Sequence, residues 1–271
     1  MIQVYIELRS FLDDSDRELM NLVICMAGRN TRFHDVGIDI PKYLLPVSGR
    51  PVIEMIIQNL VSTHSFVSVY LVAHQRDIYF RRELETSLIA LGVDPGNLSY
   101  IGETNGQADT ANVSLDILNL DLDKPIVFHN ADTILLGRDI GALQETLQKG
   151  HGSIDVFLAE SPSYSYVDIE ENRILEIVEK RVISKWATSG LYGFPTGALF
   201  QSYFKKFIEL AQPGDHREYY ISDIINLMLA DSFIFEPLSY DVSASLSTLV
   251  IGSPEEYRFI QSSQRISNHV I

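Results

Sequence analysis

A glycine turn with two arginines follows the first apolar run of the sequence. The run Leu22–Met26 stops before Gly28, and Arg29 and Arg32 come within the next four residues. Gly28 permits a positive φ, so that successive backbone N–H groups can face an anion. Arg32 can add a bidentate contact to phosphate. The pattern predicts a phosphate-binding turn, although an ordinary turn with two solvated arginines fits the same spacing.

The overall charge of the chain makes two closely spaced arginines informative. Its 271 residues include 36 acidic and 21 basic side chains, which give a formal net charge of −15. Such a surface repels nucleic acid and anionic membranes, so we expect neither as a partner. A small anionic ligand would then need cations gathered at its own site. The turn matches neither the P-loop pattern nor G-x-G-x-x-G.

Three more charged residues occupy positions that could serve phosphate chemistry. Lys42 follows Pro41 ten residues after the turn, and Asp132 follows the apolar run 125–131. A carboxylate at a strand end can hold Mg²⁺, or it can simply close a turn. Lys180, within the segment Val178–Lys180, is compatible with an ordinary surface lysine. These residue types fit a phosphate and metal site, but their spacing alone does not require one.

Apolar runs alternate with helical patterns from residue 21 onward. Strands are predicted at 22–27, 67–73, 98–102 and 125–131, and helices at 52–61, 78–92, 107–120 and 140–150. Buried strands alternating with helices indicate a mostly parallel sheet that is covered on both faces. The carboxyl ends of such strands are where ligands bind, and both the arginine turn and Asp132 follow predicted strands.

The second half of the chain predicts a β-rich lobe added to this sheet. Alternating polar and apolar residues indicate antiparallel strands, and two further segments have helical spacing. The strands are expected at 153–160, 165–171, 173–180 and 188–194, and the helices at 198–211 and 219–231. We expect a single domain over residues 20–265. Residues 1–19 form an N-terminal extension that serves as an oligomer contact or an appendage.

The sequence also bears on cellular context. Cys25 is the one cysteine, so no internal disulfide can form. No basic and then apolar leader opens the chain, and no run approaches 18 apolar residues. We therefore expect a cytoplasmic protein without a membrane partner.

The segment 26–60, MAGRNTRFHDVGIDIPKYLLPVSGRPVIEMIIQNL, is specific as a whole. It resembles the N-terminal signature of the sugar-1-phosphate nucleotidylyltransferase family, a G-x-G-T-R turn followed by P-K-x-L-L-P. Asn30 stands where the family commonly has a small residue, and asparagine tolerates the left-handed conformation. The resemblance extends over residues 21–262. It implies the family's three-layer α/β/α nucleotidyl transferase fold of GT-A type, with a mostly parallel mixed sheet and a β-rich second lobe.

The resemblance also implies roles for individual residues. Arg32, Lys42, Asp132 and Lys180 would be catalytic, and Asp132 would hold Mg²⁺. The nucleotide would contact Ala27, Gly28, Arg29, Asn30, Thr31, Gly106 and Gln107. The acceptor would contact Glu179, Lys180 and Gly190.

One departure concerns the metal site. Many family members have a second metal-binding aspartate two residues before the glycine of the closing motif, where this chain has Val250 before Gly252. A branch associated with capsule and surface-polysaccharide synthesis also lacks it, and this sequence is most similar to that branch. Asp223 and Asp241 are candidates for a substitute ligand, although each also fits a helix-start or loop position.

The implied reaction is the transfer of NMP from a nucleoside triphosphate to a sugar-1-phosphate, with release of pyrophosphate, for surface-polysaccharide synthesis. One alternative is a cytidylyltransferase with a non-sugar phosphorylated acceptor. Another, prompted by Val250, is a nucleotide-binding homologue without turnover. The base, the acceptor and the possible homo-oligomeric state stay open at this stage.

Overall fold

The computed structural model describes residues 19–61, 66–211, 218–243 and 247–262. The N-terminal extension predicted for residues 1–19 therefore lies, except for Leu19, outside the described residues. None of the helices in the described part of the chain is both long and apolar enough to cross a lipid bilayer.

Four parallel strands form the half of the sheet that carries the arginine turn. Strand β1 (Met20–Met26) pairs with β6 (Ile126–Asn130) on one side and with β4 (Phe66–His74) on the other, and β4 pairs with β5 (Leu98–Ile101). All four were predicted from apolar runs. The runs of β1, β4 and β6 form central strands because a parallel sheet covered on both faces buries the side chains on either side, whereas β5 lies at the edge of the sheet.

The second half of the chain extends this sheet with antiparallel pairs. Strand β11 (Trp186–Phe194) pairs with β6, with β8 (Gly152–Leu158) and, at one position, with β9 (Tyr166–Glu170). Strand β9 forms a hairpin with β10 (Arg173–Val178). These pairings confirm the β-rich lobe. Strand β12 (Phe235–Leu238), which runs parallel to β8, was not predicted.

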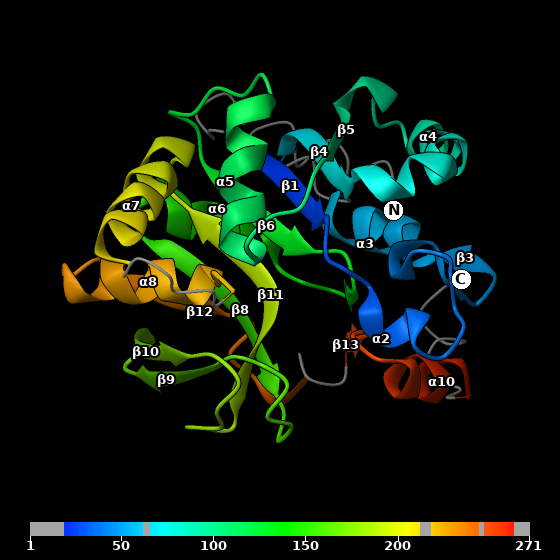
Figure 1. The fold of residues 1–271 in the computed structure, drawn as a ribbon. Helices are drawn as coiled ribbons and strands as arrows, with labels where there is room; N and C mark the ends of the chain where they lie inside the picture. Colours follow the sequence, from blue (N-terminus) through cyan, green and yellow to red (C-terminus); the bar gives the residue numbers. More distant parts are fainter. Residues whose placement is uncertain (1–18, 62–65, 212–217, 244–246, 263–271) are drawn as a thin grey trace, which may run out of the picture.

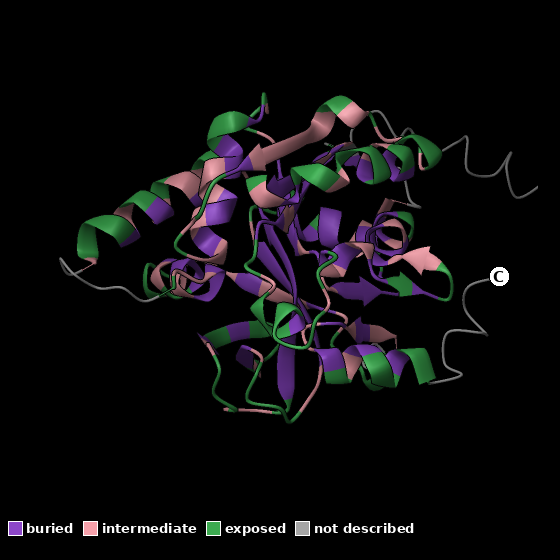
Figure 2. Ribbon diagram, turned by 45° about the vertical axis from the view of Figure 1, so that its right-hand side comes forward, coloured by how far each residue is buried: buried purple, intermediate pink, exposed green. Residues whose placement is uncertain are grey.

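Helices cover both faces of the sheet (Figure 1). In β1, Leu22 and Ile24 join one hydrophobic cluster and Val23 joins another on the opposite face, as the two-residue period of a strand requires. Figure 2 shows the buried strands at the centre and exposed residues on the outer helical surfaces. The first cluster includes residues of α3 (Val52–Leu60), α4 (Arg81–Ala90), α6 (Ile140–Gln148) and α10 (Pro254–Ser262), and the second includes residues of α5 (Gln107–Ile117), α7 (Gly197–Leu210) and α8 (Ile221–Ala230). The three-layer arrangement is confirmed.

Short elements close the edge of the sheet where β1 and β6 end. Strand β7 (Thr133–Leu135) pairs with β13 (Thr248–Val250), which brings the closing motif beside Asp132. The turn after β1 continues into α2 (Thr31–His34), and Phe33 packs edge-on against Tyr257 of α10. The remaining short elements are η2 (Lys42–Leu44), β2 (Pro46–Val47), β3 (Arg50–Pro51), η4 (Gln75–Phe80) and η5 (Pro95–Asn97). The helix predicted at 78–92 is thus α only from residue 81, because its start is a 3₁₀ segment.

Candidate functional site

A cavity of about 580 Å³ opens at the carboxyl ends of β1 and β6. Parallel strands place their carboxyl ends at one edge of the sheet, which is the usual position of a ligand site in such folds. The cavity brings together twelve of the thirteen residues predicted for the site, and Lys180 is the exception. The twelve are Ala27, Gly28, Arg29, Asn30, Thr31, Arg32, Lys42, Gly106, Gln107, Asp132, Glu179 and Gly190.

The turn after β1 differs in one respect from the prediction. The residue with positive φ is Asn30, at 57°, and Gly28 is not among the residues with positive φ. Asn30 is the N-cap of α2 and donates through Nδ2 to the carbonyl of Ile40 at 3.3 Å. Gly28 instead leaves space, since a Cβ atom there would have no neighbour within 4 Å. The glycine therefore keeps the cavity wall open, and Asn30 makes the turn.

The opposite wall begins with the loop before α5. Gly106 precedes the helix with φ of 120°, and a Cβ atom there would lie 2.7 Å from both the backbone N and O of Tyr219. Around it, Asn105 accepts from the N–H of Tyr219 at 2.6 Å, and the carbonyl of Tyr219 accepts from the N–H of Ala108 at 2.9 Å. A side chain at position 106 would break this backbone contact.

Gly106→Ala is therefore expected to lower the free energy of unfolding by about 1–3 kcal/mol, the usual range for a strained backbone conformation. Gly102→Ala is the matched control, because Gly102 lacks both the positive φ and any neighbour within 4 Å. Its change should stay within about 0.5 kcal/mol. Urea unfolding followed by circular dichroism measures both, and equal stabilities would refute the packing role of Gly106.

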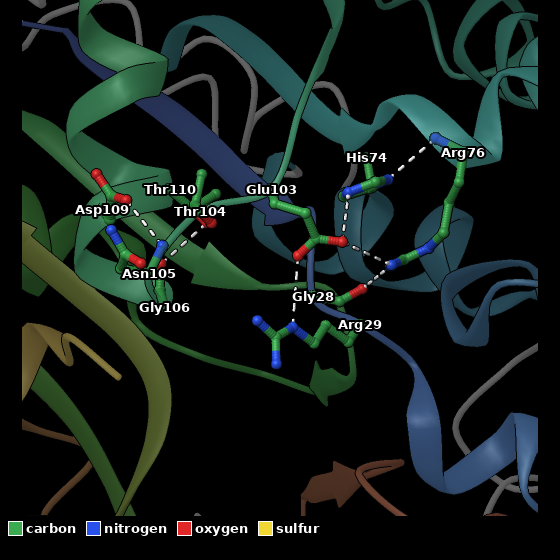
Figure 3. A network of polar contacts seen from close by, with 10 residues as sticks. All are labelled: Gly28, Arg29, His74, Arg76, Glu103, Thr104, Asn105, Gly106, Asp109 and Thr110. Carbon is green, nitrogen blue, oxygen red and sulfur yellow. Dashed lines mark hydrogen bonds and ion pairs between the residues drawn. The ribbon is translucent and has the colours of Figure 1, made fainter. Parts of the chain in front are cut away.

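Figure 3 shows a charged network that joins the two walls. The Glu103 carboxylate lies 3.4 Å from Arg29 Nε, 3.1 Å from His74 Nε2 and 3.8 Å from Arg76 Nη1. His74 Nδ1 accepts from the backbone N–H of Arg76 at 3.0 Å, so in the neutral ring Nε2 carries the proton and faces Glu103. Arg76 also donates to the carbonyl of Gly28. The network holds the arginine turn against the segment that leads into α5.

The floor of the cavity carries an ion pair between two predicted residues. Lys42 Nζ lies 2.6 Å from Asp132 Oδ2, and the two side chains are 26% and 17% exposed. Burial raises the pKa of Asp132, but the Lys42 ammonium and the Thr133 hydroxyl outweigh this effect and hold the pKa below its ordinary value. Asp132 is therefore a carboxylate at neutral pH and already faces a cation.

The predicted acceptor residues occupy the wall formed by β10 and β11. Glu179 accepts from the hydroxyls of Ser165 and Ser222, and burial raises the pKa of its carboxyl. Gly190, with φ of 90°, faces the side chain of Asn130, and a Cβ atom there would lie 2.3 Å from Asn130 Nδ2. Asn130 in turn accepts from Gln107. Asn130 thus connects Gly190 on this wall with Gln107 on the opposite wall.

Lys180 lies beside the cavity and is not part of its lining. Its ammonium group donates a hydrogen bond to the hydroxyl of Tyr220 and lies 3.7 Å from the carboxylate of Glu218. Both of these partners line the cavity. Since the Lys180 side chain is 50% exposed, it would have to leave Tyr220 to reach a ligand.

Several lining residues were not predicted from the sequence: Glu103, Asn130, Tyr164, Glu218, Tyr220 and Glu256. Most come from loops or helix starts, where no periodicity marks an inward-facing side chain. The Ser253-x-x-Glu256 spacing matches a helix capping box, which favours a local role for that glutamate. The order of residues in the chain therefore did not reveal that Glu103, Glu218 and Glu256 also face the cavity.

The described residues of the cavity offer positive charge and a carboxylate, the groups that phosphate and Mg²⁺ chemistry require. Arg29, Arg32 and Lys42 supply positive charge at one end, where the turn leaves open space. Asp132 supplies a carboxylate oxygen, the kind of ligand that Mg²⁺ prefers. Its Oδ2 already contacts the Lys42 ammonium, so the donor set suits a cation at this position.

Comparison with known proteins agrees with the fold. The family described as Nucleotidyl transferase matches residues 22–235. A bifunctional protein GlmU from Picosynechococcus sp. is 26% identical over 240 residues, which are 82% of this chain and 49% of the relative. This chain thus spans about half the length of that curated relative.

Two solved structures show the same fold. A nucleoside-diphosphate-sugar pyrophosphorylase from Vibrio cholerae RC9 superposes with a TM-score of 0.76 and 22% identity, over 89% of this chain and 100% of that one. A UDP-glucose pyrophosphorylase complexed with UDP-glucose gives a TM-score of 0.68 and 18% identity, over 90% of this chain and 97% of the other. The family match covers most of the chain and includes the arginine turn, Lys42 and Asp132. The chain therefore belongs to the nucleotidyl transferase family of enzymes.

Proposed function

We propose that this protein transfers NMP from a nucleoside triphosphate to a sugar-1-phosphate and releases pyrophosphate. The observation that carries the proposal is the convergence of Arg32, Lys42 and Asp132 on one cavity from three separate segments of the chain. The relatives support the sugar phosphate as acceptor, since one structure is named as a nucleoside-diphosphate-sugar pyrophosphorylase and another was solved with UDP-glucose.

The obstacle in this reaction is repulsion between two polyanions. An acceptor phosphate must approach the α-phosphorus of the triphosphate, and the protein has little covalent chemistry to perform. Arg29 and Arg32 are exposed on the turn and would hold the triphosphate, because guanidinium groups match phosphate oxygens. Lys42, which is paired with Asp132, would offset negative charge of the phosphates and so reduce the repulsion between triphosphate and acceptor.

The acceptor would bind against the wall of β10 and β11. Glu179 is held by two serine hydroxyls, so its remaining acceptor capacity can orient sugar hydroxyl groups. Lys180 would release Tyr220 and turn toward the acceptor phosphate. Gly106 and Gln107 would meet the base at the opposite wall, where the backbone approaches closely.

Mg²⁺ fits the donor set of the floor, with Asp132 as its protein ligand. When bound, it would neutralise phosphate charge that Arg32 and Lys42 leave uncompensated. Mg²⁺ retains waters and takes its other ligands from phosphates, so one or two protein carboxylates are sufficient.

We further place the reaction in the cytoplasm, where nucleoside triphosphates are available, and assign its product to surface-polysaccharide synthesis. The basis is the capsule-branch pattern of the sequence, E-K-x-x-I-S-x-x-A-T-x-G-x-Y-x-F, which this chain matches at every specified position of residues 179–194. Resemblance to the same branch also supports the second candidate function, a cytidylyltransferase with a non-sugar phosphorylated acceptor.

Pyrophosphate is expected only when triphosphate, phosphorylated acceptor and Mg²⁺ are all present. The measurement is a coupled pyrophosphate assay with the four ribonucleotides and dTTP against sugar-1-phosphates and non-sugar phosphates. A non-sugar acceptor that alone supports release would select the second candidate. Folded protein that binds nucleotide but releases no pyrophosphate with any acceptor would instead identify a nucleotide-binding homologue without turnover.

A further inference from the structure

Gly252 marks a point on the cavity floor that two carboxylates approach. A Cβ atom at Gly252 would lie 3.2 Å from Glu256 Oε2 and 4.0 Å from Asp132 Oδ2. Both residues line the cavity. Carboxylate oxygens of Asp132 and Glu256, which are far apart in the sequence, therefore face one small space. This space is open because residue 252 is a glycine and has no side chain.

The backbone fixes this arrangement from both sides. The N–H of Ile251 donates to the carbonyl of Asp132 at 2.7 Å, beside the pairing of β7 with β13. Ser253 then caps α10 by accepting from the N–H of Glu256 at 3.2 Å. The closing motif is thus held against Asp132, and the first turn of α10 projects Glu256 into the cavity.

The side chain of Glu256 is oriented through one of its two oxygens. Tyr164 donates its hydroxyl to Glu256 Oε1 at 2.5 Å, and within the described part of the chain Oε2 makes no hydrogen bond or ion pair. A glutamate at this helix position usually turns back to the N-cap N–H. Glu256 instead reaches across to Tyr164, which leaves Oε2 directed at the space above Gly252.

Position 250 faces the same space. Val250 Cγ1 lies 3.8 Å from the Cβ position of Gly252, and the residue packs beside the cluster of Phe157, Tyr166 and Ala187. An apolar side chain there cannot ligate a cation. Glu256 Oε2 reaches the space near Val250 from the next helix, so a carboxylate is present although position 250 lacks one.

We propose that Glu256 is the second protein carboxylate of the divalent-cation site, paired with Asp132 across Gly252. The proposal rests on the proposed metal-dependent reaction and names a residue for it. The Lys42 ammonium, 2.6 Å from Asp132 Oδ2, is a cation already held at this floor. Carboxylate oxygens are the protein ligands that Mg²⁺ prefers, and Asp132 and Glu256 supply them from two sides of this space.

The two aspartates considered from the sequence do not meet this requirement. Asp223 accepts from the backbone N–H of Tyr220 at 3.0 Å and forms the capping box of α8. Asp241 is exposed and accepts from the hydroxyl of Ser243. Neither belongs to the cavity lining, whereas Glu256 does.

The test is Mn²⁺ binding to the nucleotide-free protein, followed by the electron paramagnetic resonance signal of free Mn²⁺. Glu256→Gln keeps the shape and the acceptor for Tyr164 but removes the charge. It should weaken Mn²⁺ binding by at least about 10-fold, the lower end of the range for losing even an outer-shell partner. Glu255→Gln removes the same charge from an exposed neighbour and should leave the affinity within about twofold of the wild type.

A third variant checks the geometry. Val250→Asp in the Glu256→Gln background should restore Mn²⁺ binding, because position 250 faces the same space, and restoration also shows that the fold is intact. Wild type and Glu256→Gln with the same Mn²⁺ binding, including none in both, would overturn the proposal. Because this readout needs no turnover, Mn²⁺ binding through Glu256 without pyrophosphate release would keep the site and reject the proposed reaction.

Discussion

Arg32→Ala and Lys42→Ala are each expected to lower turnover by roughly 10²–10³-fold, the usual loss when one preorganised charge is removed from developing phosphate charge. Arg32 is exposed and donates to the carbonyl of Gly252 at 3.4 Å, so its loss should leave the free energy of unfolding nearly unchanged. Lys42 is paired with Asp132, and its loss should cost about 1 kcal/mol of stability.

The measurement is steady-state pyrophosphate release with saturating substrates, together with urea unfolding of each variant. Arg82→Ala and Lys205→Ala are the controls, since each removes one cation from an exposed helix residue outside the cavity. Near-normal rates for both Arg32→Ala and Lys42→Ala would show that the turn holds solvated arginines and no triphosphate.

The central sheet could be predicted because its strands are buried on both faces. An uninterrupted apolar run such as Leu22–Met26 has few other stable environments in a water-soluble fold, and the helix that follows is marked by its own period. Strand β12 escaped prediction because Phe235–Leu238 includes a proline and a glutamate, and its pairing partner β8 is about 80 residues away. Strand pairing over such separations leaves no local signal.

The position of the cationic end of the cavity was predictable for a different reason. Arg29, Arg32 and Lys42 lie in a short, dense motif directly after a strand, so topology alone places them at the sheet edge. The local conformation was less predictable. The sequence favoured Gly28 for the positive φ and allowed the left-handed conformation at Asn30; Asn30 alone adopts it, and its amide bonds the backbone of Ile40.

Side-chain direction was the least predictable property. Glu256 has the spacing of a helix cap, but Tyr164, 92 residues away, draws it across the cavity. Lys180 has the predicted place in the chain, yet Tyr220 and Glu218 hold it beside the cavity. In both cases the partner belongs to a distant segment, so the direction is set by tertiary packing.

Asp132→Asn is expected to abolish turnover, because it removes the charge that would hold the metal and retains the shape. The carboxylate is 17% exposed, ionised and already paired with Lys42, so amide substitution leaves Lys42 without its counter-charge and removes the proposed metal ligand. Raising the Mg²⁺ concentration should not restore the rate.

The measurement is a Mg²⁺ titration of turnover for Asp132→Asn beside Asp223→Asn and Asp241→Asn. The latter two should reduce the rate much less, since Asp223 caps α8 and Asp241 bonds Ser243 away from the cavity. An Asp132→Asn enzyme with full rate and an unchanged Mg²⁺ midpoint would remove the metal from this floor. Full rate with a higher midpoint would instead show that Asp132 binds the ion but that turnover does not depend on this carboxylate.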